Sequence, residues 1–326
     1  MRSEAEVISY LRRRFPAGGG LRVGIGDDAA VLAGEGRRDW VVTTDLMVEG
    51  DHFLPGIPAH AVGWKALARS LSDIAAMGAR PRYALVALAV PRATPSRWVR
   101  AFFAGMRALA RPQGVKLAGG DLSSAPQIVA DVQVLGEVSS KRAVLRRGAR
   151  AGELIFVSGT LGLSQLGLIA LRHRRVRLTP LLKRALRAHR CPAPRLALAQ
   201  ALVRRARVSA MIDVSDGLST DVAHLCQASR VGARIFAGRI PAVELPVDLV
   251  RRFRTNALEL ALNGGEDYEL LFTLPGVQAK RMPKQLAGVK LTPIGEITRG
   301  RRVTLVDSRG RERELKPRGW DPFRRR

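Results

Sequence analysis

Several acidic residues of this chain follow apolar or glycine-rich segments instead of lying among polar neighbours. Asp27 and Asp28 stand between two glycines and the apolar residues 29–32. Core segments normally avoid acids, so a carboxylate pair in this setting requires a counter-ion. Five more segments have the same character: Thr43-Thr44-Asp45, Leu71-Ser72-Asp73, Gly119-Gly120-Asp121, residues 212–217 (IDVSDG) and residues 264–267 (GGED). The pattern indicates one shared cluster of hard oxygen ligands, suited to Mg²⁺.

A strand and a helix are expected to position the first of these acids. Residues 40–44 are β-branched and aromatic, which predicts a strand from whose end Thr43, Thr44 and Asp45 emerge together to face one ion. A capped turn after an edge strand would explain this segment taken alone. Residues 61–77 are rich in Ala and Leu and stop at Gly78, as a helix does. Asp73 lies near the C-terminus of that helix, where a carboxylate opposes the helix dipole, so a site is favoured over a solvated face.

The other acids are also expected to follow strands. A short strand over residues 115–118 runs into Gly119-Gly120-Asp121, whose glycines allow the backbone to approach a phosphate closely. A strand over residues 210–212 leads to Asp213 and Asp216, and a helix is expected over residues 218–229. Ser215 or Asp216 is a suitable N-cap for this helix, which is the purely structural alternative.

The remaining pattern predicts two α/β domains with a boundary near residue 150. Further strands are expected over residues 83–90, 128–138, 154–157, 268–273, 291–298 and 302–306, and further helices over residues 3–14, 95–109, 163–173, 179–189 and 195–206. The length of 326 residues and a hydrophobic content of 46% allow such a core.

Composition favours an anionic partner and gives no sign of secretion. The net charge is +27, with basic residues spread along the chain and not interleaved with aromatic ones. This favours a surface that attracts anions over nucleic-acid binding, which stays as an alternative. Cys191 and Cys226 form no metal-binding spacing and are expected to be structural thiols. Because no signal peptide and no 18-residue apolar run occur, we expect a cytoplasmic protein without membrane contact.

Six motifs in a fixed order together resemble the thiamine-monophosphate kinase family. They are residues 24–30 (GIGDDAA), 43–53 (TTDLMVEGDHF), 71–79 (LSDIAAMGA), 119–121 (GGD), 212–218 (IDVSDGL) and 264–270 (GGEDYEL). The resemblance implies an α/β (α+β) two-domain fold similar to that of aminoimidazole ribonucleotide synthetase. Residues 1–150 would bind ATP and magnesium and form a β-barrel across a homodimer. Residues 151–326 would form a C-terminal α/β domain that closes over the substrates.

The resemblance also implies roles for individual residues. Those matching magnesium ligands are Asp28, Thr43, Thr44, Asp45, Asp73, Asp121, Asp213 and Asp216. Those matching ATP contacts are Phe103, Gly120, Asp121, Arg146 and Ser215. Those matching contacts with thiamine monophosphate are His52, Glu266 and Trp320. ATP would be the co-substrate and several Mg²⁺ ions the cofactors, in a kinase that makes thiamine diphosphate.

This reaction explains why the motifs contain carboxylates and no general base. The second pKa of a phosphate monoester is about 6, so the acceptor oxygen is already anionic at neutral pH. The chain has no Walker A motif and no His-Arg-Asp loop, and only five histidines. Two other enzymes of the same fold are alternatives. Selenophosphate synthetase is disfavoured by the absence of a cysteine near the N-terminus, and both it and aminoimidazole ribonucleotide synthetase are disfavoured by the motif at residues 264–268.

Overall fold

The computed structural model describes residues 4–173 and 176–323, which form two compact units. The N-terminal unit contains residues 15–143 together with the short segment 190–196. The C-terminal unit contains helix α1 (Glu4–Arg14), residues 144–189 and the chain from residue 197 onward. Residue 3, the first of the predicted helix 3–14, lies outside the described residues. Across the described ranges, no helix is both long enough and apolar enough to cross a membrane.

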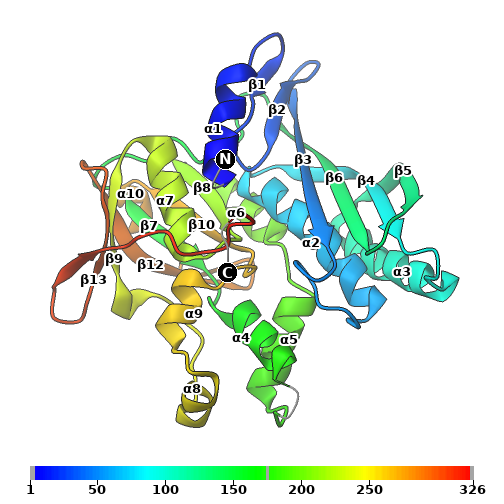
Figure 1. Cartoon of the computed structure of the whole chain (residues 1–326). Helices are drawn as coiled ribbons and strands as arrows, with labels where there is room; N and C mark the ends of the chain where they lie inside the picture. Colours follow the sequence, from blue (N-terminus) through cyan, green and yellow to red (C-terminus); the bar gives the residue numbers. More distant parts are fainter. Residues whose placement is uncertain (1–3, 174–175, 324–326) are drawn as a thin grey trace. The chain divides into compact units, whose positions relative to one another are not determined.

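The N-terminal unit is a six-stranded sheet with two helices on one face (Figure 1). Its elements are β1 (Leu21–Val23), β2 (Ala30–Ala33), β3 (Arg38–Val48), α2 (Ala59–Ala76), β4 (Arg80–Val90), α3 (Ser96–Gln113), β5 (Lys116–Ser124) and β6 (Val129–Ser139). The strand order is β1-β2-β3-β6-β4-β5, and only β4 and β5 pair in parallel. The sheet is open within the described residues, with β1 and β5 as its edges.

The two helices of this unit pack closely because small residues lie where they cross. A side chain at Gly63 of α2 would lie 1.9 Å from the carbonyl oxygen of Phe102 in α3, so only glycine fits there. Leu67, Leu71 and Ile74 of α2 are fully buried against the sheet. Helix α3 is longer than predicted and ends at Gly114, whose φ of 68° forms a left-handed cap.

The C-terminal unit is built on an eight-stranded sheet that is mostly antiparallel. Its strands are β7 (Leu154–Ser158), β8 (Ala210–Val214), β9 (Gly232–Phe236), β10 (Glu269–Leu274), β11 (Gln285–Leu286), β12 (Val289–Thr298), β13 (Val303–Val306) and β14 (Glu312–Glu314). The order is β14-β13-β9-β12-β7-β10-β8, with β11 beside β12. Strands β8 and β10 are buried along their whole length, which explains why they are mostly apolar, with Asp213, Glu269 and Thr273 as the polar exceptions.

Helices cover this sheet and form a second core beside it. They are α4 (Leu163–Arg172), α5 (Pro180–Arg190), α6 (Leu196–Arg205), α7 (Leu218–Ser229), η1 (Ala237–Arg239), α8 (Val247–Phe253), α9 (Ala257–Asn263) and α10 (Gly276–Ala279). Helix α7 packs on the sheet through Leu218, Val222 and Leu225. Residues of α4, α5, α8 and α9 form the other core, and Figure 1 shows these helices together at one end of the unit. Cys226 is buried, which raises the pKa of its thiol to about 12 and agrees with a structural role.

Candidate active site

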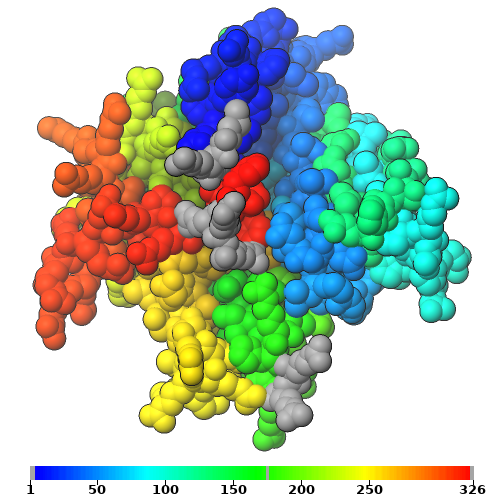
Figure 2. Space-filling model, viewed as in Figure 1, coloured from blue at the N-terminus to red at the C-terminus, as the bar shows by residue number. Residues whose placement is uncertain are grey.

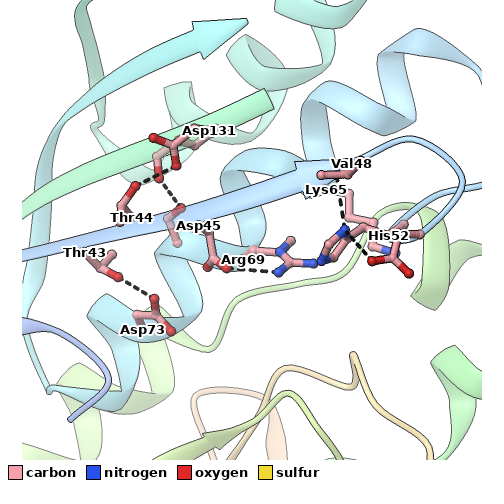
Figure 3. A network of polar contacts seen from close by, with 12 residues as sticks. Thr43, Thr44, Asp45, Val48, His52, Lys65, Arg69, Asp73 and Asp131 are labelled. Carbon is pink, nitrogen blue, oxygen red and sulfur yellow. Dashed lines mark hydrogen bonds and ion pairs between the residues drawn. The ribbon is translucent and has the colours of Figure 1, made fainter. Parts of the chain in front are cut away.

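The hydroxyl of Thr43 and the carboxylate of Asp73 meet where β3 faces the end of α2 (Figure 3), and the carboxylate of Asp28 lies nearby. Thr43 Oγ1 donates a hydrogen bond of 2.6 Å to Asp73 Oδ2 and lies 3.4 Å from the carbonyl oxygen of Asp28. One carboxylate oxygen of Asp28 lies within 4.8 Å of one oxygen of Asp73. Asp73 lies in the last turn of α2, which contains no basic residue. Two like charges at the negative end of a helix are unfavourable, so this arrangement favours a bound cation.

The residues that follow Thr43 do not all face this group, because side chains alternate along a strand. Strand β3 continues to Val48 instead of stopping at Thr44. Thr44 therefore lies on the other face of the sheet, where its hydroxyl donates a 2.6 Å hydrogen bond to Asp131 Oδ1. Asp45 shares the face of Thr43, but its Oδ1 accepts a 3.0 Å hydrogen bond from Arg69. The prediction that all three side chains face one ion is thus wrong for Thr44.

The Gly119-Gly120-Asp121 segment was expected to follow a short strand over residues 115–118, but it lies inside β5. A side chain at Gly120 would lie 1.9 Å from the carbonyl oxygen of Val86, so the close approach of strand β4 already requires glycine at this position. The sheet register aligns Asp121 with Ala87, and Ala87 with Asp131. Asp121 therefore lies level with Asp131, on the face opposite Thr43, and the structure does not bring it to Asp28 and Asp73.

His52 is held in an orientation that makes it a hydrogen-bond donor. Its Nδ1 accepts a 3.2 Å hydrogen bond from the N–H of Val48, which places the proton of the neutral ring on Nε2. Its carbonyl oxygen accepts a 2.9 Å hydrogen bond from Lys65 Nζ, a buried amine on α2. These contacts fix the segment after β3 (Figure 3). Asp51 Oδ2 lies 3.9 Å from the same Nδ1, too far to replace the Val48 bond.

Phe103 lies on the outward side of α3. Its ring packs edge-on against that of Phe102 at 5.2 Å, while Phe102 itself is fully buried. Arg100 and Arg107 lie one turn away on either side and line a shallow surface hollow with Phe103. An aromatic ring between two arginines can receive a flat ring that carries anionic groups.

A second acidic group forms in the C-terminal unit where β8 leads into α7. Asp213, at the end of β8, is 1% exposed, and Asp216 follows in the connecting loop. Asp221 in the first turn of α7 is buried too, and it accepts a 3.0 Å hydrogen bond from the N–H of Gly217. Burial raises the pKa of Asp221 well above its usual value, and the carboxylates of Asp216 and Asp213 raise it further. Negative charge is therefore concentrated here.

The structure of this segment corrects one expectation and adds one residue. The N-cap of α7 is Gly217 and not Ser215 or Asp216, and no side chain caps it in the usual way. Asp221 was not among the predicted site residues. The sequence signal for it was a carboxylate within the apolar face of the helix predicted over residues 218–229, which also contains Leu218, Val222 and Leu225.

Arg146 is the basic residue whose charge acts on this acidic group. Its positive charge lowers the pKa of Asp221 and also that of His224, which burial and Arg146 together bring to about 4. The carbonyl oxygen of Arg146 accepts a 3.1 Å hydrogen bond from Ser229 Oγ at the end of α7. The same hydroxyl accepts hydrogen bonds from the N–H groups of Gly148 and Ala149, so the basic loop is fastened to α7.

The loop before β10 lies directly against the Asp213–Asp216 segment in a strained conformation. Glu266 and Tyr268 have φ values of 65° and 50°, which side-chain-bearing residues rarely adopt. The N–H of Glu266 donates to the carbonyl oxygen of Ser215 at 2.7 Å, and that of Tyr268 donates to Val214 at 2.9 Å. Such strain persists only where the surrounding structure holds it, and it is common at binding sites.

Asp267 fastens this loop to the start of α4. Its carboxylate accepts hydrogen bonds from the N–H of Gly162 at 2.6 Å and from that of Ser164 at 3.3 Å. Burial raises the pKa of Asp267 to about 8, although these two bonds lower it. The folded protein thus binds a proton here that the unfolded chain releases near pH 4, so this group makes stability fall as the pH rises from about 4 to about 8.

Asp267→Asn imitates the protonated acid and does not titrate. We expect its unfolding temperature, relative to the parent, to rise progressively between pH 5 and pH 9. Thermal unfolding at five pH values tests this, with Asp248→Asn, an exposed residue of α8, as the control. A difference between Asp267→Asn and the parent that stays constant over this range would contradict the assignment.

The C-terminal segment, red in Figure 2, lies on the surface of the C-terminal unit and is fastened to the loop between β8 and α7 and to the start of α7. The N–H of Trp320 donates a 3.1 Å hydrogen bond to the carbonyl oxygen of Asp216. The preceding N–H groups of Arg318 and Gly319 donate to the hydroxyls of Ser219 and Thr220 in α7. The half-buried Trp320 therefore belongs to the same neighbourhood as Asp216.

Comparison with known proteins assigns the chain to a family. Residues 26–138 match "AIR synthase related protein, N-terminal domain", and residues 150–308 match the corresponding C-terminal domain. A thiamine-monophosphate kinase of Synechococcus elongatus is 38% identical over 84% of this chain and 83% of its own length. The chain belongs to the thiamine-monophosphate kinase family. Another member, from Salmonella typhimurium, is 37% identical over 85% of both chains.

A solved structure of this family agrees with the fold. "AaThiL complexed with AMPPCP and TMP" superposes with a TM-score of 0.87 at 32% identity, covering 98% of this chain and 97% of that one. The predicted two-domain fold of the thiamine-monophosphate kinase family is thereby confirmed. The single acidic cluster predicted from the sequence stays a prediction, because Asp28 and Asp73 belong to one unit and Asp213 and Asp216 to the other.

Proposed function

We propose that the protein transfers the γ-phosphoryl group of ATP to thiamine monophosphate and releases thiamine diphosphate and ADP. Membership of the thiamine-monophosphate kinase family supports this, and so do the ligands of the AaThiL complex, AMPPCP and TMP. The observation that carries the proposal is that the carboxylates of Asp28 and Asp73, from two of the predicted motifs, lie close together beside the hydroxyl of Thr43. Such a group suits a reaction in which highly charged phosphates must be brought together.

The residues present fit Mg²⁺. The carboxylates of Asp28 and Asp73 and the hydroxyl of Thr43 are hard oxygen donors, as are Asp213 and Asp216 in the other unit. Burial is the main cause of the raised pKa of Asp221, and the carboxylates of Asp216 and Asp213 raise it further, a repulsion that a divalent cation would relieve. When bound, the ions would neutralise charge on the phosphates. We do not include the hydroxyl of Thr44, since it donates to Asp131 on the opposite face.

The chain's own residues would bind and orient the two substrates. We propose that His52 donates its Nε2–H to the substrate phosphate, because Nδ1 already accepts the N–H of Val48. Arg146 and Ser215 would contact ATP, and Phe103 with its flanking arginines would receive the adenine. Glu266 and Trp320 would contact the thiamine moiety, through charge and ring stacking respectively. Roles for Asp45, Gly120 and Asp121 stay predictions.

Product analysis tests this function directly. Purified protein with MgATP and thiamine monophosphate is expected to form thiamine diphosphate and ADP in equal amounts, as separated by chromatography. Excess EDTA is expected to abolish product formation, and added Mg²⁺ to restore it, because the phosphates and the acidic groups repel one another without cations. Undiminished turnover in EDTA would contradict the magnesium requirement but not the choice of substrate.

We propose in addition that the protein is a homodimer joined through the N-terminal sheet, in line with the β-barrel expected from the sequence. Edge strand β5 is exposed along its whole length, and its Leu122 is 68% exposed. Leu46 is 52% exposed and Trp40 38% exposed on the sheet face opposite α2. An open edge beside exposed apolar residues is a common site for pairing between chains. The cytoplasmic location expected from the sequence stays a prediction.

Light scattering at micromolar concentration and physiological ionic strength is expected to give the mass of a dimer. Leu122→Lys places a charge on the open edge and is expected to shift the mass toward the monomer, because burying an unpaired charge is costly. Val277→Lys is the control, since Val277 is 70% exposed in the C-terminal unit. A monomeric parent would contradict the proposed dimer.

A further inference from the structure

His189 is a buried histidine that none of the predicted roles includes. It lies near the end of α5 and is 4% exposed. Its Nδ1 lies 3.3 Å from Glu266 Oε2 and 3.1 Å from Ser164 Oγ. Ser164, His189 and Glu266 come from α4, α5 and the loop before β10, and all belong to the C-terminal unit. Three polar side chains from three segments thus meet at one ring nitrogen.

The chemistry of the three groups determines which of them donates. An ionised glutamate only accepts hydrogen bonds, so a bare Nδ1 at 3.3 Å would place two lone pairs against each other. A proton on Nδ1 removes this repulsion and lets the ring donate toward Glu266 whether the ring is neutral or charged. The hydroxyl of Ser164 then accepts from the same N–H. The carboxylate therefore favours the Nδ1–H form of His189, and the hydroxyl, which can donate or accept, is compatible with it.

The backbone of Glu266 is already fixed, but its side chain needs a separate restraint. The φ of 65°, the N–H bond to Ser215 and the anchoring of Asp267 at the start of α4 hold the loop. A glutamate side chain retains several rotamers on such a backbone. Contact with a buried, packed imidazole removes most of that freedom. Ser164 serves both restraints, since its N–H donates to Asp267 and its hydroxyl contacts His189.

We propose that His189 is a positioning residue that orients the Glu266 carboxylate toward the cationic, amino-bearing thiamine moiety of the substrate. This rests on the proposed function. The side chain of Glu266 is 22% exposed, so a ligand can reach it, whereas the side chain of His189 is only 4% exposed. A carboxylate repels the phosphate end of thiamine monophosphate and attracts its thiazolium and aminopyrimidine. His189 therefore acts on recognition of the organic part of the acceptor and not on ATP.

Paired substitutions separate this role from simple packing. His189→Leu fills much of the ring's volume without a donor, and His189→Asn places an amide N–H near the position of Nδ1. We expect His189→Leu to raise the KM for thiamine monophosphate about ten- to hundredfold, as for loss of a hydrogen bond to a charged group. The KM for ATP and kcat should stay within about twofold of the parent, and His189→Asn should lie closer to the parent. His60→Gln, an exposed histidine of α2, is the control.

A double-mutant cycle and a spectrum complete the test. In a Glu266→Gln background, which itself raises the same KM, His189→Leu should add little, because the carboxylate it orients is gone. In the parent, ¹⁵N spectra of the five histidines should show a protonated Nδ1 for His189, and Glu266→Gln should shift it. This spectrum remains decisive if His189→Leu does not fold.

Three outcomes would overturn the inference. The first is an unprotonated Nδ1 in His189, and the second is a parental KM for thiamine monophosphate in His189→Leu. The third is an equal rise in KM for both substrates in His189→Leu, together with lower activity in His189→Asn than in His189→Leu. Failure of the parent itself to phosphorylate thiamine monophosphate is a different result. It would contradict the proposed function, whereas the spectrum would still report on the contact between His189 and Glu266.

Discussion

Asp73→Asn is expected to lower turnover by about two orders of magnitude or more while leaving the metal-free protein at least as stable as the parent. The substitution removes one of the two carboxylates of the Asp28–Asp73 pair. This pair would hold a cation that stabilises the charge developing on the phosphates in the transition state. Asparagine keeps an oxygen that can accept the hydrogen bond from Thr43. The substitution also removes a negative charge from the C-terminus of α2, an effect of about 0.3–1 kcal/mol in favour of folding.

Saturating MgATP should reverse the order of stability. Ligand binding to the folded state raises the unfolding free energy by RT ln(1 + [L]/Kd), and the variant gains less because its cation site has lost a charged ligand. Thermal unfolding with and without MgATP, together with steady-state rates, measures both effects. Asp248→Asn is the matched control, since it removes an exposed aspartate from the first turn of α8 and should keep parental turnover. Parental activity and parental MgATP stabilisation in Asp73→Asn would remove Asp73 from the site.

Free thiamine is expected to be a poor substrate, with kcat/KM lower than for thiamine monophosphate by about 10²-fold or more. The alcohol of thiamine must lose a proton on attack, and a positioned base usually contributes 10²–10⁴-fold to such a step. His52, the histidine of the predicted phosphate contact, is unsuited to be that base because its Nδ1 accepts from Val48 and its Nε2 carries the proton. The phosphate of the monophosphate is mostly dianionic above pH 6 and needs no base.

The pH dependence offers an independent check of this reasoning. The kcat/KM for thiamine monophosphate should rise through pH 6 as the acceptor phosphate loses its second proton, and then become level. Parallel rate measurements with both acceptors between pH 5.5 and pH 8 test the two expectations together. Comparable turnover of thiamine and thiamine monophosphate would contradict an acceptor that must already be anionic.

The sequence predicted the elements well where periodicity and end signals agreed. Helix α7 has the predicted bounds, and helix α2, predicted over residues 61–77, spans Ala59–Ala76. Asp73 was predicted near the C-terminus of α2, where the structure has it, because Gly78 marks the end of that helix. Strand lengths were predicted less well. The strands were expected to stop at Thr44 and at Ala118, but β3 and β5 continue through Asp45 and Gly119 because neighbouring strands supply their hydrogen-bond partners.

The errors at the site follow from those strand lengths. A residue beyond a strand can face any direction, whereas a residue inside one must follow the alternation, which separates Thr44 from Thr43. Asp221 and His189 were missed for different reasons. Asp221 contacts Gly217, four residues away, and its sequence signal, a carboxylate on the apolar face of a predicted helix, was not used. His189 meets Glu266 across a separation of 77 residues. Local patterns contain no information on such contacts.

Transfer of labelled phosphate tests the central claim most directly. The protein is incubated with Mg²⁺, thiamine monophosphate and ATP labelled in the γ-phosphate, and the products are separated. The proposed function predicts that the label appears in the terminal phosphate of thiamine diphosphate, in amounts equal to the ADP formed, and that Asp73→Asn transfers at most about one hundredth as much in the same time. Release of the label as free phosphate, with no labelled thiamine diphosphate, would contradict it.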